Sequence, residues 1–514
     1  MFLKQVLFVL LLLLAFGLSA QIKYQANVET VLQKAKGNRI ELEKGLNYFY
    51  KGKDTLKIKA INFLVSNMDI HKSYNYFWAD SMGKRLPYNE LDYPTFDSSI
   101  AAFNNLKAII SKIHPVTNIY NDMDSIKGDY LIDNVNRAFS EWNQPWTKNI
   151  SFDDFCEYVL PYRISVEPLQ DWRGIYERRF AKHLELTNDK KSSEKLDYFE
   201  AECNSWFTNT FAIEQRNEPL PRLGALQLLH RKKGACEDGA SLIALALRSQ
   251  GIPATVDFVP YWATSSASHF LYSSPTILKA PKIVIDSLGN PLPKEFRMPR
   301  EPGKVLRTTY SKQNGTLATL QPTNEIPNGF LHSVNYKDVT DEYWETQDVD
   351  IPVNITPLTK DKENIVYSCV FNFLDWRVDW WGKISNNKAH FTNMGKGAVY
   401  LPMKYANNKL NPVGYPMAVG YKHQQLLQPD TLHKHTIVLK EQEKYLKFHP
   451  FKKYTLFCWN NRWQKMEEQV ARDTTTRMSF DGIPRNALLL LFPEDTKRKE
   501  RPFIVTDEGN RVWF

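Results

Sequence analysis

The chain has 514 residues, 43% of them hydrophobic, and a net charge of +9 at pH 7. A length of this size corresponds to about three domains, and the apolar fraction is sufficient to bury several cores. Lysine and arginine are not gathered into a dense block, so the charge predicts no nucleic-acid partner and no membrane-surface footprint. The composition is that of a globular, multidomain protein.

Residues 1–20 have the pattern of a secretory signal peptide. Lys4 supplies the positive start, Leu7 to Phe16 form an apolar core, and Ser19 and Ala20 are the small residues before a cleavage site. We therefore predict cleavage after Ala20 and a secreted or periplasmic protein. No later stretch approaches the roughly 20 apolar residues that a membrane-spanning helix requires, so no transmembrane segment is predicted.

The cysteines are few, odd in number and far apart. None of them forms a C-x-x-C pair, which argues against both a disulfide framework and a zinc site. We predict no metal and no cofactor. The cysteines are Cys156, Cys203, Cys236, Cys369 and Cys458.

The N-terminal region, residues 21–200, is predicted to be helical. Its apolar residues recur at spacings of three and four, which is the period of one helix face. Examples are Leu42, Leu46 and Phe49, then Ile61, Leu64 and Met68, then Ile100, Phe103 and Leu106.

Phe152 to Arg163 is unusually dense in aromatic and charged residues and meets a helix breaker at Pro161. Two interpretations remain open for Tyr162, Arg163 and Glu167. They line a groove, or they belong to a helix end that is packed into its neighbour.

Gly234 to Ala254 combines a thiol, a buried helix and a helix stop. Apolar residues recur at helical spacing after Cys236, and Gly251 followed by Pro253 is the usual punctuation beyond a last turn. Cys236 is therefore predicted at the start of a helix, where the backbone N–H groups and the helix dipole favour a thiolate. Glu237 and Asp238 suit the first turn but oppose a negative charge on sulfur.

Three β-prone runs follow this helix: Thr255–Val259, Ser268–Tyr272 and Lys282–Asp286. His269 stands at the head of the second run, and Asp286 ends the third. The order supplies a nucleophile, a base and an orienting carboxylate in sequence.

These residues resemble the core of the transglutaminase-like superfamily, papain-related thiol enzymes with the order Cys, His, Asp. Phe270 and Leu271 after the histidine depart from the family pattern. The helical leader and Asp257–Trp262 also resemble large exported transglutaminase-like proteins of Bacteroidetes. The matching positions in the core are Gly234, Cys236, Leu247, Arg248, Gly251, Ile252, Pro253, His269 and Asp286.

The predicted chemistry is acyl transfer through a catalytic triad. Cys236 attacks an amide carbonyl, His269 carries the proton to the leaving amine, and Asp286 orients the imidazole. Asp286 also precedes a turn and is alternatively a hairpin-turn residue. In that case Asp257 or a water orients His269, or the site is degenerate.

The C-terminal part is predicted to form two small antiparallel β-sandwich domains, divided near Pro429. Short alternating runs are separated by Gly, Asn and Lys turns, as in a sandwich. The runs include Val366–Phe373, Ala398–Pro402, Tyr454–Trp459 and Ala487–Phe492.

Two side-chain groups in this part have both a functional and a structural interpretation. Trp376, Trp380 and Trp381 stack on sugar rings if they are exposed, and otherwise they are core aromatics. His433 and His435 have the spacing of a metal pair on one strand face, yet the sequence offers no third ligand.

The sequence thus predicts an α+β protein with four parts after the signal peptide. They are a helical region (21–200), a transglutaminase-like core (201–327), a β-sandwich domain (328–429) and a C-terminal β domain (430–514). The predicted function is that of a secreted thiol enzyme acting on a peptide or protein substrate, by amide hydrolysis or by transglutamination. The alternative is a non-catalytic scaffold that binds glycan or protein through its β domains.

Overall fold

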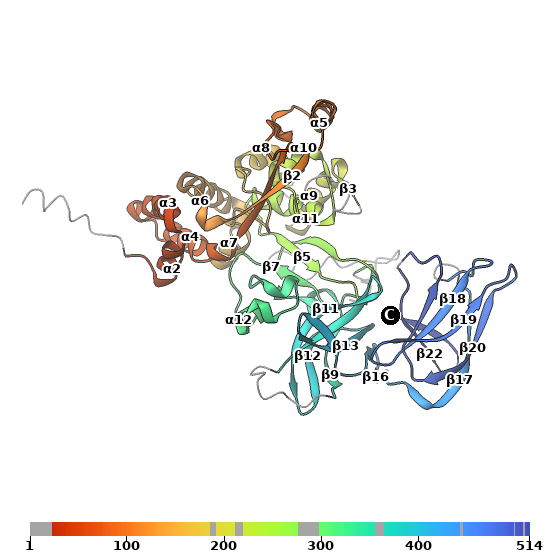
Figure 1. Cartoon of the computed structure of the whole chain (residues 1–514). Helices are drawn as coiled ribbons and strands as arrows, with labels where there is room; N and C mark the ends of the chain where they lie inside the picture. Colours follow the sequence, from red (N-terminus) through yellow and green to blue (C-terminus); the bar gives the residue numbers. More distant parts are fainter. Residues whose placement is uncertain are drawn as a thin grey trace, which may run out of the picture. The chain divides into compact units, whose positions relative to one another are not determined.

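The computed structural model describes residues 23–185, 192–210, 219–275, 298–354, 364–442, 446–497, 499–506 and 509–514. The chain divides into two compact units (Figure 1). Unit 1 comprises residues 1–238 and 245–253, and unit 2 comprises residues 239–244 and 254–514. Helices dominate the described part of unit 1 and antiparallel strands that of unit 2, so the chain mixes both kinds of element. The predicted boundaries at residues 200, 327 and 429 stay predictions.

The helices of unit 1 follow the apolar spacing of the sequence. Leu42, Leu46 and Phe49 are all buried on one face of α3, and Leu131 and Val135 of α6 are equally buried. The helices are α2 (Ala26–Lys34), α3 (Arg39–Gly52), α4 (Thr55–Ser66), α5 (Phe96–Ile109), α6 (Gly128–Trp142), α7 (Phe152–Tyr158), α8 (Arg173–Glu185), α9 (Ser192–Trp206), α10 (Ala225–Arg231) and α11 (Cys236–Arg248).

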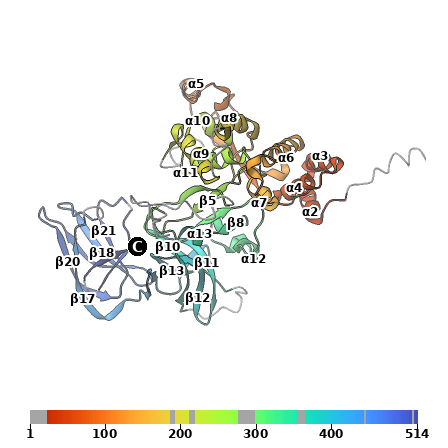
Figure 2. The same cartoon turned by 180° about the vertical axis from the view of Figure 1, so that it is seen from behind.

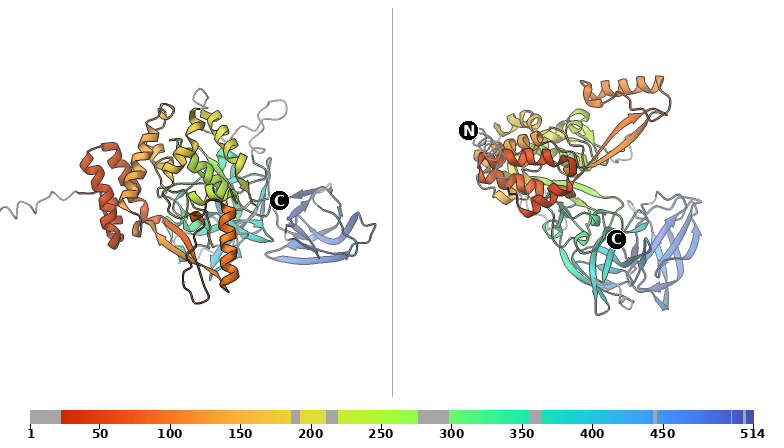
Figure 3. Two further views of the ribbon diagram at one scale, coloured as in Figure 1. Left: turned by 90° about the horizontal axis from the view of Figure 1, so that it is seen from above. Right: turned by 60° about the vertical axis from the view of Figure 1, so that its left-hand side comes forward.

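An antiparallel ribbon interrupts these helices and was not predicted. β1 (Lys72–Ala79) pairs with β2 (His114–Asn121), and the chain between them forms α5. Figure 3 shows the ribbon and α5 in orange. β1 is rich in aromatic residues and β2 in β-branched residues, and both kinds suit a pleated surface better than a helix. The expectation of an all-helical region was therefore wrong at this point.

The helix α11 begins at Cys236 and ends where the sequence predicted. Ser249 closes its last turn, and Gly251 has a φ of +73°, in the left-handed region that favours glycine. A Cβ atom on Gly251 would lie 2.4 Å from the carbonyl oxygen of Glu141. The glycine thus permits both the turn and the close approach of α6.

Unit 2 begins with a four-stranded antiparallel sheet in the order β6, β5, β7, β8. The predicted runs at Thr255 and Ser268 correspond to two of its strands, whereas Lys282–Asp286 lies outside the described residues. The strands are β5 (Thr255–Val259), β6 (His269–Ser273), β7 (Leu306–Thr308) and β8 (Tyr336–Asp338).

An eight-stranded antiparallel sheet follows, in the order β16, β15, β13, β10, β11, β12, β9, with β14 paired to β13. Figure 2 shows β10, β11, β12 and β13 of this sheet. Its hydrophobic core also includes Ala263 of the loop between β5 and β6, and Phe514. The strands are β9 (Thr346–Pro352), β10 (Ile365–Asn372), β11 (Asp375–Ser385), β12 (Lys388–Gly395), β13 (Ala398–Ala406), β14 (Lys409–Pro412), β15 (Met417–Val419) and β16 (Gln424–Leu426).

The last strands form a pair, β17 with β20, and a five-stranded sheet in the order β19, β18, β21, β22, β23. They enclose a second core that includes Leu456, Phe480 and Leu491. Among the residues that the structure describes, no helix is long and apolar enough to cross a membrane. The strands are β17 (Asp430–Lys440), β18 (Lys453–Trp459), β19 (Trp463–Val470), β20 (Arg477–Arg485), β21 (Leu489–Pro493), β22 (Phe503–Val505) and β23 (Arg511–Trp513).

Strand β11 of the eight-stranded sheet carries a buried carboxyl group. Both oxygens of Asp379 are shielded from solvent and have no hydrogen-bond partner among the described residues. A Cβ atom on Gly303 would lie 2.2 Å from Oδ2 of Asp379, so the carboxyl group fits against this glycine. Burial raises the pKa of Asp379 well above its ordinary value, although the neighbouring Lys304 ammonium opposes the shift.

We expect Asp379→Asn to weaken the pH dependence of stability. The folded chain keeps the Asp379 proton at pH values where the unfolded chain, with a pKa of about 4, has lost it. The stability contributed by this group is therefore complete in acid and is lost as the pH rises towards the raised pKa. Melting temperatures from about pH 5 to pH 8 should fall less steeply for Asp379→Asn than for the natural chain. The exposed Asp375→Asn is the control, and equal slopes for all three proteins would contradict the assignment.

Candidate active site

Cys236 is positioned by a short strand and by a carboxylate that caps its helix. β4 (Lys233–Gly234) pairs in parallel with β3 (Thr208–Asn209) and leads directly into α11. The Asp238 carboxylate accepts hydrogen bonds from the backbone N–H groups of Ala235 (2.9 Å) and Leu223 (3.1 Å). These bonds satisfy a donor at the helix start and hold the approach to Cys236 in place.

Gly234 is required by the same carboxylate. A Cβ atom at this position would lie 2.6 Å from Cβ of Asp238, closer than two such carbons approach. The Gly-x-Cys spacing of the sequence therefore has a local physical cause. The glycine makes room for the residue that caps the cysteine helix.

The electrostatic surroundings of the thiol include one carboxylate and one guanidinium. The Cys236 thiol donates to Oε2 of Glu237 at 3.4 Å, and Oε1 of Glu237 lies 3.1 Å from Nη1 of Arg222. Burial lowers the pKa of Arg222, and the Glu237 charge opposes that shift. A carboxylate beside the sulfur disfavours the thiolate, as the sequence predicted, and Arg222 partly offsets it. Sequence reasoning missed Arg222, since nothing in its local pattern links it to Cys236.

Cys236 differs from the other cysteines in its exposure. It is half-buried, whereas Cys156, Cys203, Cys369 and Cys458 are buried, and all five are free thiols. Burial raises the pKa of the thiol to about 12 for Cys156 and Cys203 and to about 11 for Cys458. The four buried thiols are therefore protonated and shielded, and the accessible one is Cys236.

We expect Glu237→Gln to make Cys236 more reactive. The substitution keeps the size of the side chain and removes a negative charge close to the sulfur, which favours the thiolate. The rate of alkylation by iodoacetamide near pH 7 should rise up to about tenfold. The exposed Glu325→Gln serves as the control. An unchanged or slower rate in Glu237→Gln would contradict this electrostatic account.

His269 is the first residue of β6 and pairs with Val259 of β5. Its ring stacks on the indole of Trp262, with centroids 5.7 Å apart and an interplanar angle of 25°. Burial lowers the pKa of His269, which favours the neutral imidazole near pH 7. A neutral imidazole has the protonation state of a general base.

The two predicted site residues that the structure describes, Cys236 and His269, belong to different units. Cys236 belongs to unit 1 and His269 to unit 2, although the middle of α11, Gly239–Ala244, belongs to unit 2 as well. Asp286, the third member of the predicted triad, lies outside the described residues.

Asp257, the alternative orienting residue, forms an ion pair with Arg307. Both of its oxygens bond the Arg307 guanidinium, Oδ1 to Nε at 3.0 Å and Oδ2 to Nη2 at 2.8 Å. The Tyr343 hydroxyl donates to Oδ2 at 2.7 Å. The carboxylate is fully buried in this network, so the structure does not support it as the partner of His269.

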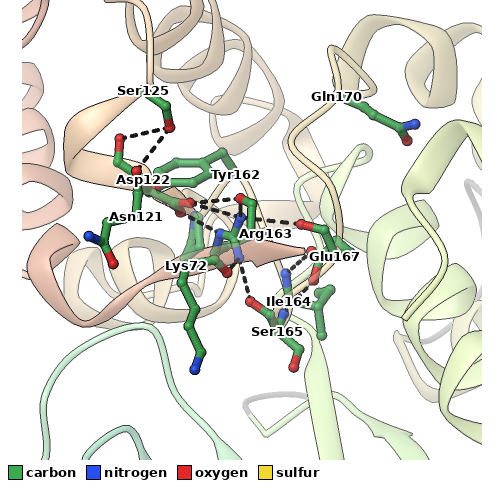
Figure 4. A network of polar contacts seen from close by, with 12 residues as sticks. Lys72, Asn121, Asp122, Ser125, Tyr162, Arg163, Ile164, Ser165, Glu167 and Gln170 are labelled. Carbon is green, nitrogen blue, oxygen red and sulfur yellow. Dashed lines mark hydrogen bonds and ion pairs between the residues drawn. The ribbon is translucent and has the colours of Figure 1, made fainter. Parts of the chain in front are cut away.

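Of the two interpretations left open for Tyr162, Arg163 and Glu167, the structure contradicts the groove and supports internal packing. All three side chains are buried, and Figure 4 shows Arg163 directed at Asp122 and Tyr162 within a network of polar contacts. Nε of Arg163 lies 2.7 Å from Oδ2 of Asp122. The dense charge of this stretch is therefore internal to the fold of unit 1.

The structure also describes the tryptophans and the histidine pair of the C-terminal part. Trp376 and Trp380 are buried, which excludes them as an exposed platform for sugar rings, and Trp381 is half-buried. His433 pairs with Asp430 at 2.7 Å. No group of three or more potential metal ligands occurs among the described residues, so the structure adds no third ligand to the His433 and His435 pair.

The comparison with protein families agrees with the local structure. Residues 182–272, which include Cys236 and His269, match the profile of the transglutaminase-like superfamily. No curated protein matches the sequence. The resemblance to exported proteins of Bacteroidetes stays a prediction.

Proposed function

Because the chain carries a transglutaminase-like domain over residues 182–272, we propose that it is a thiol-dependent acyl-transfer enzyme. Its substrate is a peptide or protein amide, and its nucleophile is Cys236. The observation that carries the proposal is the half-exposed thiol at the first residue of α11, in a chain whose other cysteines are buried.

The reaction proceeds in two steps. The Cys236 sulfur attacks the amide carbonyl, and His269 transfers the thiol proton to the leaving amine as the C–N bond breaks. The backbone N–H of Cys236 donates to the developing oxyanion. Water or a second amine then attacks the thioester and releases the thiol, which yields either hydrolysis or a crosslink.

Asp286 is the proposed orienting residue for His269. A carboxylate on the second ring nitrogen fixes the imidazole tautomer and stabilises the imidazolium. Asp257 is unsuited to this role because Arg307 and Tyr343 already bond both of its oxygens.

We further propose that the protein is exported by a signal peptide at residues 1–20, with cleavage after Ala20. These residues lie outside the described part of the chain, and the proposal rests on their composition.

A library of peptides incubated with the purified protein, with and without added primary amines, tests the function. Peptides shortened or deamidated without amine indicate hydrolysis, and amine incorporation indicates transglutamination. Mass spectrometry of iodoacetamide-treated protein should find Cys236 modified before the four buried cysteines. If no peptide reacts and Cys236 is not modified first, the chain is the non-catalytic scaffold instead.

A further inference from the structure

The loop that delivers His269 contains an uncommon backbone conformation. Residues 260–268 connect β5 to β6, and within them Ala267 has a φ of +137°. This region is essentially restricted to glycine, because the Cβ atom of other residues clashes with the backbone. Ala267 stands two residues before His269. An alanine keeps such a conformation only where the surroundings hold it.

The side chain of Asn372 supplies the contacts that hold it. Nδ2 of Asn372 donates to the carbonyl oxygens of Trp262 (3.0 Å), Ser265 (2.8 Å) and Ala267 (3.1 Å). Oδ1 of Asn372 accepts from the backbone N–H of Ala267 at 3.3 Å. The strained residue is thus bonded at both its N–H and its C=O by one fully buried amide.

These contacts reach His269 by two routes. Ala267 is joined to it through Ser268, and the loop is closed by a bond from the N–H of Trp262 to the carbonyl of Ala267 at 3.0 Å. Trp262 in turn stacks on the imidazole of His269. The Asn372 amide therefore fixes the backbone of Ala267, two residues before His269, and the backbone of Trp262, whose ring stacks on the imidazole.

The hairpin that carries Asn372 is itself tightly turned. Asn372 ends β10 and faces Asp375 of β11, and the two residues between them, Phe373 and Leu374, have φ values of +52° and +63°. Both are non-glycine residues in the left-handed region. The N–H of Phe373 donates to Oγ of Ser266 at 3.3 Å, which adds a bond between hairpin and loop.

A half-buried donor from the last part of the chain reaches the same loop. The Arg501 guanidinium donates to the carbonyl oxygens of Ala263 and of Phe371, the residue before Asn372. It also donates to the carbonyl oxygen of Phe514 at 2.8 Å. The loop therefore accepts hydrogen bonds from the eight-stranded sheet, through Asn372, and from the C-terminal segment, through Arg501. All of these residues belong to unit 2.

We propose that Asn372 is a positioning residue for His269, so that the eight-stranded sheet is part of the catalytic apparatus and not a separate module. The catalytic consequence rests on the proposed function, while the positioning of the imidazole does not. Asn372 touches no reacting atom, and it acts through Trp262 and Ala267. Among the described residues, the side-chain hydrogen bonds of Asn372 all go to this loop, which distinguishes it from an asparagine that only stabilises its own sheet.

The test compares Asn372→Ala with the matched variant Asn335→Ala in the full chain. Asn335 also donates from its amide to a backbone carbonyl, that of Thr309 at 2.9 Å, but it does not contact the loop. The first readout is the titration of His269 by NMR of histidine-labelled protein, with His269→Gln used to assign the signal. The second is the division of any peptide-amidase effect between kcat and KM.

In Asn372→Ala the loop is expected to relax and to expose the imidazole, so that the pKa of His269 rises towards its ordinary value. The kcat should fall by about 10²-fold, the effect of displacing a catalytic group by roughly 1 Å, with a smaller change in KM. Asn335→Ala should alter neither readout. An unchanged His269 titration in folded Asn372→Ala would overturn the proposal, whether or not the protein is an active enzyme.

If Asn372→Ala does not fold, Asn372→Asp takes its place. This variant keeps the size of the side chain and the acceptor for the Ala267 N–H, and it loses the three donated bonds. Because the charge of a carboxylate at position 372 would raise the pKa of His269 by itself, the readout for Asn372→Asp is the ring contact between His269 and Trp262, followed by NMR. Loss of this contact supports the proposal, and an unchanged contact overturns it. Failure of both variants to fold would overturn it, because Asn372 would then be needed for folding and not specifically for His269.

Discussion

Acyl-transfer activity is expected to fall by about 10⁴-fold or more in Cys236→Ala, while the chain stays folded. Removing the nucleophile of a thiol or serine enzyme leaves only the residual catalysis of binding and oxyanion contacts. The stability should change little, because Cys236 is half-buried and the substitution removes a single sulfur atom. Turnover of a reactive library peptide and the melting temperature measure the two effects.

Cys458→Ala is the matched control for this experiment. Cys458 is buried in the core of the last sheets, 2% exposed, and lies outside the proposed site. We expect it to lower the melting temperature and to leave kcat unchanged. A Cys236→Ala protein that retains activity, or that unfolds together with its loss of activity, would argue for a structural cysteine.

Asp122→Ala is expected to destabilise the chain by about 3–5 kcal/mol, the cost of breaking a buried ion pair by removing one partner. Asp122 is fully buried and lies against Nε of Arg163 at 2.7 Å. It also accepts from the Ser73 hydroxyl at 2.8 Å and from the Tyr162 hydroxyl at 3.0 Å. Without the carboxylate, the guanidinium remains buried with its charge uncompensated (Figure 4). Denaturant unfolding followed by circular dichroism measures the loss.

Asp129→Ala is the control, because it removes an ion pair that is exposed and not buried. Asp129 forms an ion pair of similar length with Lys44, 2.6 Å, but the two side chains are 78% and 50% exposed. Solvent screening makes such a surface pair contribute little to stability. If Asp122→Ala and Asp129→Ala lower the free energy of unfolding by similar amounts, burial of the Asp122 network does not stabilise the chain as predicted.

The cysteine region was predictable from sequence because its signals are local. The apolar spacing after Cys236 and the glycine at position 251 both lie within about 15 residues of the cysteine, along or just beyond a single helix. The two runs that became β5 and β6 were recognised in the same way, from their own β-branched and aromatic residues. The ribbon β1–β2 was missed because residues 80–113 separate its two strands, and no local period records a pairing across that distance.

The polar surroundings of the site were not predictable. Arg222 was not linked to Glu237, and Asn372 lies more than 100 residues from the Ala267 that it holds. Tyr162, Arg163 and Glu167 were recognised as unusual, yet the sequence left open whether they faced a groove or the core. A buried polar group takes whichever partner the folded chain brings to it, and no local period records that choice.

Four features were predictable from the sequence alone. They are the candidate thiol, the helix that begins with it, the strand that contains His269 and the likeness to transglutaminase-like proteins. Each of these depends on spacing within a few residues, where periodicity and turn chemistry act directly on the backbone. The folded structure was needed to show that Cys236 is half-buried while the other cysteines are buried, that Asp257 pairs with Arg307, and that Asn372 bonds the loop before His269. Burial and long-range hydrogen bonds arise when distant segments pack, and that packing exists only in the folded chain.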